Sequence, residues 1–287
     1  MRASSDEVTL LAVETVSENK CFGGLQGVYT HASAETQTEM TFAVFVPEHQ
    51  PGDKLPVLWY LSGLTCTHAN VMDKGEYRRL ANALGLMIVC PDTSPRGAQV
   101  ADDDSYDMGQ GAGFYVDATE QPWAKHFRMR AYVETELPAL IEQHFPVDMT
   151  RQAIFGHSMG GHGALTMALR NPDRFKSVSA FAPIVAPSEC PWGHKALGGY
   201  LGPDRATWRN YDSCALIDDG ARVRDILIDQ GGADQFLEEQ LKPDLLVAAC
   251  KRAAIPLTLN MREGYDHSYF TISTFMDDHL RWHAERL

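Results

Sequence analysis

The chain has no long apolar run: none of its stretches approaches the roughly 18 consecutive apolar residues that a membrane-spanning helix needs. Its first residues, MRASSDEVTLL, also lack the basic flank and apolar core of a signal peptide. Positive charge is scarce as well, since 25 basic residues stand against 38 acidic ones and leave a formal net charge of −13. A broad basic surface is therefore not expected, which argues against nucleic acid or an anionic membrane as partner.

Closely spaced cysteines are also missing. The six cysteines are scattered, with no CxxC pair among Cys21, Cys66, Cys90, Cys190, Cys214 and Cys250. No spacing of cysteine and histidine suggests a zinc site. Scattered thiols without an export signal are typical of a reducing compartment, so we expect a cytoplasmic protein that holds no metal.

Short apolar and β-branched runs bounded by turn residues predict eight strands. They cover residues 7–16, 39–47, 55–63, 85–92, 152–158, 176–183, 225–231 and 255–261. From the third onward these runs are almost wholly apolar, as strands covered on both faces must be. The first two alternate more and are separated by a glycine-rich connection at 21–30, which suits an antiparallel start.

Helical patterns alternate with the later strands, over residues 70–84, 123–145, 159–172, 243–254 and 268–287. This alternation predicts an α/β fold with a mostly parallel, eight-stranded sheet flanked by helices. Pro138 predicts a kink or a division in the second helix, and Pro243 fits the first position of the fourth. No linker or repeat divides the chain, so we expect one domain over residues 1–287, with long excursions at 96–121 and 186–224.

One serine stands between two glycines in the sequence FGHSMGGHGAL, residues 155–165. Two interpretations are open: the serine caps a loose helix start, or it is a nucleophile on a turn where only glycine fits beside it. Gly156, Ser158 and Gly160 match the pattern GxSxG, which is a weak signal by itself. The context favours the nucleophile, because Ser158 follows an apolar strand and opens a helix whose first N–H groups stabilise developing negative charge.

A serine nucleophile needs a base, and the base needs an acid that orients it. In this strand order both come later in the chain, past the ends of subsequent strands. Asp234 follows the strand at 225–231, and His267 follows the strand at 255–261. The order Ser158, Asp234, His267 is therefore the one expected for a catalytic triad.

Four other residues compete for these roles. Asp229 lies within a strand and suits a structural hydrogen bond. Asp266 adjoins His267, and neighbouring side chains usually point apart. His157 and His162 lie too close to the serine to approach its Oγ in line, so packing or structural roles fit them better.

Acyl transfer also needs N–H donors for the oxyanion. The backbone N–H of Met159, directly after the serine, is one candidate, and that of Leu64, in the loop after the third strand, is the other. A plain turn at Ser62 and Gly63 is the alternative interpretation of that loop. Cys66 lies two residues beyond Leu64 without a strand-to-helix turn of its own, so we expect a thiol beside the substrate pocket rather than a nucleophile.

Three further features receive plainer interpretations. The sequence GQGAGF at 109–114 follows an acidic loop rather than a strand, so a dinucleotide-binding loop is not expected. The acidic cluster at 102–107 lacks the glycine and terminal glutamate of an EF-hand, and a solvated loop is favoured over a calcium site. Trp192 lies in the second excursion, where pocket lining and ordinary packing are both open.

Eight stretches together resemble the S-formylglutathione hydrolase family, also called the esterase D family. They are NKCFGGLQGVYTH, YLSGLTCTHAN, CPDTSPRG, GAGFYVDATEQPW, FGHSMGGHGALTMALRNPDRFKSVSAFAPI, CPWGHKALGGYLG, DILIDQGGADQFL and GYDHSYFTISTFMDDHL. The resemblance spans almost the whole chain. It implies an α/β-hydrolase fold, no cofactor, and hydrolysis of the small-molecule substrate S-formylglutathione to glutathione and formate in formaldehyde removal. It also implies a homodimer with side activity on short acyl esters.

The resemblance assigns the same site residues: the triad Ser158, Asp234 and His267, the backbone donors Leu64 and Met159, and Cys66 and Trp192 in the pocket. One departure lies in QGGADQF at 230–236, because the family is usually more polar before the acid. Since a formyl group is tiny, we expect a tight acyl pocket. Two alternatives are a general short-chain carboxylesterase, with the glutathione thioester as a minor substrate, and a non-catalytic binding protein, which would need a broken triad.

Overall fold

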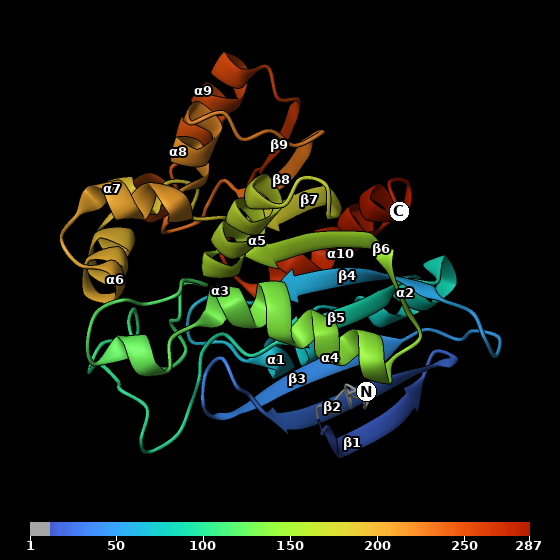
Figure 1. Cartoon of the computed structure of the whole chain (residues 1–287). Helices are drawn as coiled ribbons and strands as arrows, with labels where there is room; N and C mark the ends of the chain where they lie inside the picture. Colours follow the sequence, from blue (N-terminus) through green and yellow to red (C-terminus); the bar gives the residue numbers. More distant parts are fainter. Residues whose placement is uncertain (1–11) are drawn as a thin grey trace, which may run out of the picture.

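The computed structural model describes residues 12–287, which contain one nine-stranded sheet with helices on both faces (Figure 1). The strands are β1 (Glu14–Cys21), β2 (Gly24–Ala32), β3 (Glu39–Val46), β4 (Leu55–Leu61), β5 (Met87–Pro91), β6 (Val147–His157), β7 (Phe175–Phe181), β8 (Ile226–Gly231) and β9 (Leu257–Arg262). They lie in the order β1-β2-β3-β5-β4-β6-β7-β8-β9. The pairs from β1 to β5 are antiparallel. Those from β5 to β9 are parallel.

The sheet confirms the predicted α/β fold and its antiparallel start, but the predicted count of eight strands is wrong. The segment 21–30, expected to be a glycine-rich connection, instead supplies most of β2, which pairs with β1 and β3. A strand tolerates glycine here because the ring of Tyr29 occupies the space that a Cβ on Gly27 would need. Of the predicted strand at 7–16, residues 7–11 lie outside the described residues, and residues 14–16 open β1.

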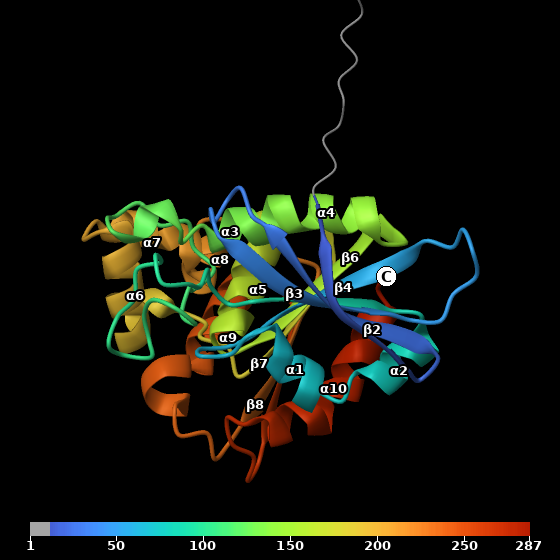
Figure 2. The same ribbon diagram turned by 90° about the horizontal axis from the view of Figure 1, so that it is seen from below.

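The helices form a layer on each face of the sheet. They are α1 (His68–Lys74), α2 (Arg78–Leu84), α3 (Met129–Ala131), α4 (Leu137–His144), α5 (Met159–Arg170), α6 (Pro191–Leu201), α7 (Arg205–Trp208), α8 (Ser213–Asp218), α9 (Pro243–Ala253) and α10 (Tyr269–Ala284). Short 3₁₀ turns cover Trp123–Lys125, Pro187–Glu189 and Arg209–Tyr211, and π turns cover Tyr132–Glu136 and Leu237–Leu241. Figure 2 shows α3, α4 and α5 on one face of the sheet and α1, α2 and α10 on the other. Each layer encloses its own apolar core.

Several helices differ from the prediction in instructive ways. The helix expected at 70–84 divides into α1 and α2, because Glu76 between them takes a positive φ of 55°. A π turn interrupts the next predicted helix before Pro138, which then lies in the first turn of α4, where its missing N–H costs nothing. Pro243 opens α9 as predicted. The excursion at 186–224 carries α6, α7 and α8.

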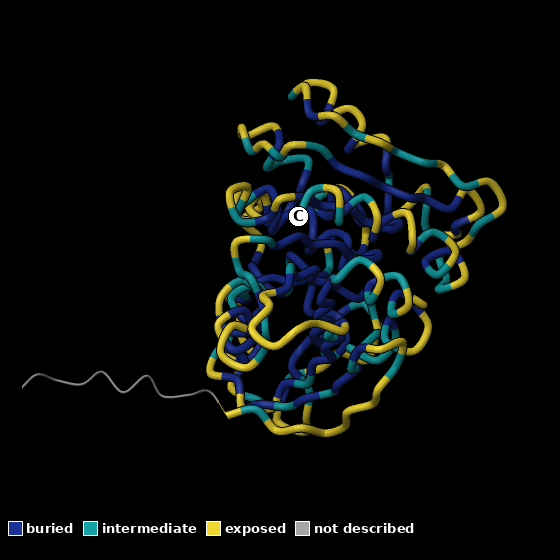
Figure 3. The backbone as a smooth tube through the Cα atoms, turned by 90° about the vertical axis from the view of Figure 1, so that its right-hand side faces the viewer, coloured by how far each residue is buried: buried dark blue, intermediate teal, exposed yellow. Residues whose placement is uncertain are grey.

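Every residue of β5 and β8 is buried, and most residues of β4, β6 and β7 are buried as well. Figure 3 shows this buried backbone running through the middle of the molecule, with exposed residues on the turns around it. Because β4, β6, β8 and β9 run parallel, the loops after their carboxyl ends meet at one edge of the sheet. Among residues 12–287, no helix has the length and apolar character to cross a membrane.

Candidate active site

Ser158 lies at the sharp turn between β6 and α5. Its backbone has a φ of 58° and a ψ of −118°, a strained conformation for any residue other than glycine. The glycines make the turn possible: a Cβ on Gly156 would overlap the Gly160 carbonyl, and one on Gly160 would overlap the Leu61 carbonyl. The Ser158 side chain makes no capping hydrogen bond to α5, so the capping interpretation is wrong.

His267 and Asp234 are joined by a short hydrogen bond. His267 Nδ1 lies 2.5 Å from Asp234 Oδ2, and the two side chains are 12% and 0% exposed. The turn and the end of β8 fix the carboxylate, because Oδ1 accepts the Phe236 N–H at 2.8 Å and Oδ2 accepts Gln230 Nε2 at 3.2 Å. A carboxylate on Nδ1 selects the tautomer in which Nε2 of a neutral His267 carries no proton and is free to act as a base.

One cavity of about 170 Å³ brings most of the predicted site residues together. Ser158, His267, Leu64, Cys66 and Trp192 all line it. Of the two remaining predicted residues, Asp234 lies behind His267, and Met159 is the first residue of α5.

Aromatic side chains that sequence reasoning missed complete the cavity wall. Phe236 packs against Trp192, with 4.7 Å between ring centroids, and lies edge-on to His267 at 5.0 Å. The Tyr106 hydroxyl accepts a hydrogen bond from Trp192 Nε1 at 3.3 Å. The position of Phe236, two residues after Asp234, is the one sequence signal that marked it; Tyr106 lay within a loop interpreted as solvated.

That acidic loop is anchored to α6 rather than freely solvated. Lys195 Nζ lies 2.9 Å from an Asp103 oxygen and 2.6 Å from an Asp107 oxygen, and Tyr106 lies between these two aspartates. Lys195 thereby fixes the loop whose tyrosine lines the cavity. Within the part of the chain that the structure describes, no group of three acidic, histidine or cysteine side chains is placed to hold a metal ion.

The loop after β4 places the proposed oxyanion donor Leu64 against the serine. A Cβ on Gly63 would lie 3.1 Å from the Ser158 Cβ, which shows how closely this loop approaches. The segment at 109–114 braces it, because the Thr65 N–H donates to the Gly111 carbonyl at 2.9 Å. Among residues 12–287 the Leu64 N–H has no hydrogen-bond acceptor, and Met159 begins a helix whose first N–H groups have no intrahelical partner.

The competing residues take no part in the aspartate–histidine pair. His157 also lines the cavity, but it is buried against His267, with 4.4 Å between ring centroids. Burial lowers the pKa of His157 well below the usual value, and the neighbouring His267 ring lowers it further. Burial lowers the pKa of His162 to about 4, and its Nε2 donates to the Phe114 carbonyl at 2.9 Å. Asp266 Oδ1 accepts the Ser268 N–H at 3.0 Å and its hydroxyl at 2.6 Å, so it serves the start of α10.

Burial raises the pKa of the Cys66 thiol, although nearby Lys74 opposes this. Because the thiolate is the reactive form, we expect iodoacetamide to inactivate the protein slowly at pH 7 and faster as the pH rises past the usual thiol range. Inactivation follows because an alkylated Cys66 would fill part of the 170 Å³ cavity. The measurement is the rate of loss of esterase activity against pH.

Matched variants locate the effect. Cys66→Ser should keep activity and resist iodoacetamide, whereas Cys21→Ser, at the end of β1, should remain sensitive. Rapid inactivation at neutral pH, or inactivation that persists in Cys66→Ser, would contradict this expectation.

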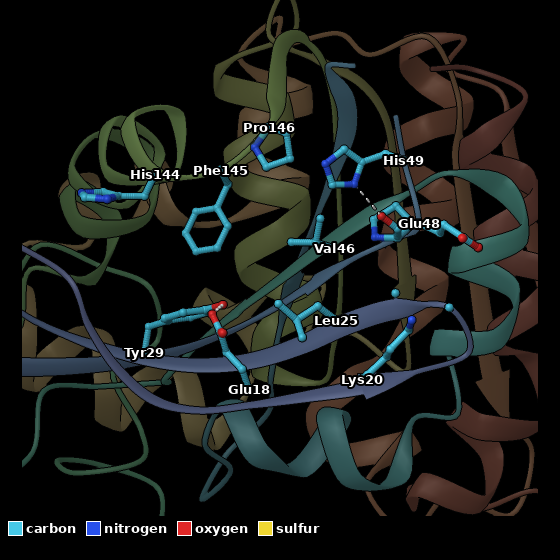
Figure 4. A pocket seen from close by; sticks show the side chains of 13 residues that line it. Glu18, Lys20, Leu25, Tyr29, Val46, Glu48, His49, His144, Phe145 and Pro146 are labelled. Carbon is cyan, nitrogen blue, oxygen red and sulfur yellow. Dashed lines mark hydrogen bonds between the residues drawn. The ribbon is translucent and has the colours of Figure 1, made fainter. Parts of the chain in front are cut away.

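A larger cavity, of about 580 Å³, lies among β1, β2, β3 and the end of α4 (Figure 4). Its polar groups bond to one another: the Tyr29 hydroxyl donates to Glu18 at 2.9 Å, and His49 Nδ1 donates to the Pro47 carbonyl at 2.9 Å. It contains neither Ser158 nor the aspartate–histidine pair. The smaller cavity is therefore the candidate active site.

The fold is that of the α/β-hydrolases, and the serine turn and the aspartate–histidine pair lie where that fold carries a catalytic triad. The family model described as "Putative esterase" matches residues 33–284. An S-formylglutathione hydrolase from Paracoccus denitrificans is 57% identical over 277 residues, covering 96% of this chain and 99% of the relative. One from Mus musculus is 52% identical over 281 residues, with the same coverage. The chain therefore belongs to the S-formylglutathione hydrolase family of esterases.

Solved structures agree with this assignment. The structure of an S-formylglutathione hydrolase from Agrobacterium tumefaciens is 64% identical, with a TM-score of 0.94, and covers 95% of this chain and 99% of its own. FphF, a serine hydrolase from Staphylococcus aureus, is only 19% identical with a TM-score of 0.74, over 91% of this chain and 98% of its own, and shares the fold alone.

Proposed function

We propose that this chain is a serine hydrolase that cleaves the thioester S-formylglutathione to glutathione and formate, a step in formaldehyde removal. The observation that carries the proposal is the short Asp234–His267 hydrogen bond beside the cavity that His267 shares with Ser158. The names of the relatives and their identities of 52% to 64% support the choice of substrate.

The first half of the reaction acylates the serine. His267 Nε2 takes the Ser158 proton as Oγ attacks the formyl carbonyl, and Asp234 stabilises the imidazolium that results. The N–H groups of Leu64 and Met159 hold the oxyanion of the tetrahedral intermediate. Collapse of this intermediate breaks the C–S bond, and glutathione leaves readily because thiol pKa values, about 8.5, are far below those of alcohols. The proton that His267 took from Ser158 passes to the departing sulfur, which returns His267 to its neutral form for the second half.

The second half hydrolyses the formyl-serine ester. A water molecule gives its proton to His267 and attacks the same carbonyl, with the same two N–H groups on the oxyanion. Collapse returns the proton to Ser158 Oγ and releases formate. Both halves use only groups of this chain, so no cofactor is part of the proposal.

The volume of the cavity, about 170 Å³, supports a small acyl group, because pockets for drug-sized ligands hold roughly 300–1,000 Å³. We expect kcat/KM to fall roughly tenfold or more from S-formylglutathione to S-acetylglutathione, and further for longer acyl chains. The test measures kcat/KM for this thioester series and for nitrophenyl acetate and hexanoate.

The same series separates the alternatives. Equal rates with acetyl and hexanoyl esters would contradict a tight acyl pocket. A higher kcat/KM for nitrophenyl acetate than for S-formylglutathione would favour a general short-chain carboxylesterase instead. Absence of turnover and of fluorophosphonate labelling together would favour a binding protein.

The proposal also includes a cytoplasmic homodimer without nucleic-acid or membrane partners. The six free thiols support a reducing compartment. The net charge of −13 supports the absence of anionic partners. The resemblance to the esterase D family supports the dimer.

A further inference from the structure

His267 lies on a short segment, residues 263–268, that joins the end of β9 to the start of α10. Its acid, Asp234, lies on the turn after β8. A backbone hydrogen bond joins the roots of these two segments, because the Gly232 N–H donates to the Arg262 carbonyl at 2.8 Å. The alignment of acid and base therefore depends on how β8, β9 and α10 are held together.

One buried carboxylate in β8, that of Asp229, contacts both elements that the His267 segment joins. Nε of Arg262, the last residue of β9, donates to Asp229 Oδ1. His279 Nε2, ten residues into α10, donates to Oδ2 at 2.8 Å. The Asp229 and His279 side chains are wholly buried, so solvent screens their interaction little.

The charges on these groups follow from their surroundings. Burial would raise the pKa of Asp229, but the hydrogen bonds from His279 and Arg262 and the charge of the Arg262 guanidinium outweigh it and hold that pKa below its usual value. Burial lowers the pKa of His279, although Asp229 opposes this. Asp229 is therefore an anion that accepts from a neutral imidazole and a guanidinium.

A line of hydrogen bonds continues behind His279 into β7. Ser179 Oγ lies 2.7 Å from His279 Nδ1 and 2.8 Å from His283 Nε2. Ser177 Oγ lies 2.7 Å from His283 Nδ1. Because His279 donates to Asp229 through Nε2, its Nδ1 accepts from Ser179. Ser179 then accepts from His283, which accepts from Ser177, so every group has one assigned role and α10 is fixed against β7 and β8.

We propose that Asp229 is a positioning residue for the general base: by holding β9 and α10, which the segment that carries His267 joins, it aligns this imidazole between Asp234 and Ser158. The inference rests on the proposed function, in which His267 is the base. Asp229 does not line the cavity, so its loss should slow the chemical step rather than weaken substrate binding. A displacement of about 1 Å in such a group costs roughly 100-fold in rate.

A second ion pair involving the same strand and helix region provides a matched control. Arg286, just beyond α10, places Nη2 2.8 Å from Oδ2 of Asp225, which directly precedes β8. This pair also ties the C-terminal region to β8, and its side chains are 15% and 21% exposed. It lies at the opposite end of both elements from His267, so its loss should affect stability alone.

The experiment compares Asp229→Asn, Arg262→Met and Asp225→Asn in the full chain. It measures kcat and KM for S-formylglutathione, the rate at which a fluorophosphonate labels Ser158, and the melting temperature. For Asp229→Asn we expect kcat and the labelling rate to fall roughly 10- to 100-fold with KM within about twofold of wild type. Arg262→Met should show a smaller fall in the same two rates. Asp225→Asn should melt earlier at wild-type rates.

Wild-type kcat and labelling in both Asp229→Asn and Arg262→Met, with only a lower melting temperature, would overturn the proposal and leave Asp229 a structural residue. If Asp229→Asn does not fold, Arg262→Met decides, because Arg262 lies partly exposed at the end of β9. Labelling does not depend on the thioester. A wild-type protein that is labelled but does not cleave S-formylglutathione would therefore contradict the proposed substrate and not the role of Asp229.

Discussion

Ser158→Ala is expected to lower kcat for S-formylglutathione by roughly 10⁴- to 10⁶-fold, the cost of removing the nucleophile of a serine hydrolase. The Ser158 Oγ carries the formyl group in the covalent intermediate. An alanine at this turn after β6 has no nucleophilic atom that could replace it. Any remaining rate would come from substrate binding and from the oxyanion donors Leu64 and Met159. Release of glutathione, followed with a thiol reagent under saturating substrate, measures the loss.

The variant should keep its fold, because the Ser158 side chain makes no capping bond to α5 and its backbone N–H still donates to the Phe181 carbonyl at 2.9 Å. An unchanged melting temperature and loss of fluorophosphonate labelling are the controls. Turnover within about tenfold of wild type would mean that another group attacks the carbonyl, contrary to the expected loss. Cys66, which lines the same cavity, would be the first to examine.

The order of elements around the site could be predicted because it depends on local patterns. Apolar runs mark the strands, and glycine on both sides of a serine marks a turn that only glycine permits. Asp234 and His267 could be placed because both follow the carboxyl ends of strands, and parallel strands bring those ends to one edge. Each of these signals lies within a few residues of the position that it predicts.

What could not be predicted depends on contacts between distant residues. The segment at 21–30 contains glycines typical of a connection, and it becomes a strand because Tyr29 covers Gly27 and because β1 and β3 pair with it. Tyr106 reaches the cavity because Lys195 anchors its loop from 88 residues away, through Asp107. No window of local sequence contains both Lys195 and Asp107, and the pairing of β2 with β1 and β3 is visible only in the folded sheet.

For the buried histidines of α10, too, packing could be predicted from the sequence but the hydrogen-bond partners could not. His279 and His283 recur every four residues on the inner face of α10, a spacing that favours packing and nothing more. Their partners Ser177 and Ser179 lie about 100 residues earlier, in β7. Asp229 was correctly expected to make a structural hydrogen bond. That its two partners lie on β9 and α10, the elements on either side of the His267 segment, could be seen only in the structure.

Asp234→Asn is expected to lower kcat roughly 10⁴-fold, as the equivalent change does in serine proteases. The amide keeps an oxygen for the Phe236 N–H, so the turn should hold. However, an NH₂ group directed at His267 Nδ1 favours the tautomer in which Nε2 carries the proton. That nitrogen then has no lone pair for the Ser158 hydroxyl, and no carboxylate remains to stabilise the imidazolium.

Asp266→Asn is the matched control, because Asp266 adjoins His267 in sequence but bonds Ser268. It should retain nearly all of the wild-type kcat. Both asparagine variants remove a negative charge near the site, but only Asp234→Asn changes the orientation and tautomer of the imidazole. The difference in kcat between them therefore measures the effect of that bond. KM should change little in either variant, since neither carboxylate lines the cavity. Equal losses in the two variants would mean that the field of nearby carboxylates, rather than the bond to Nδ1, sets the reactivity of His267.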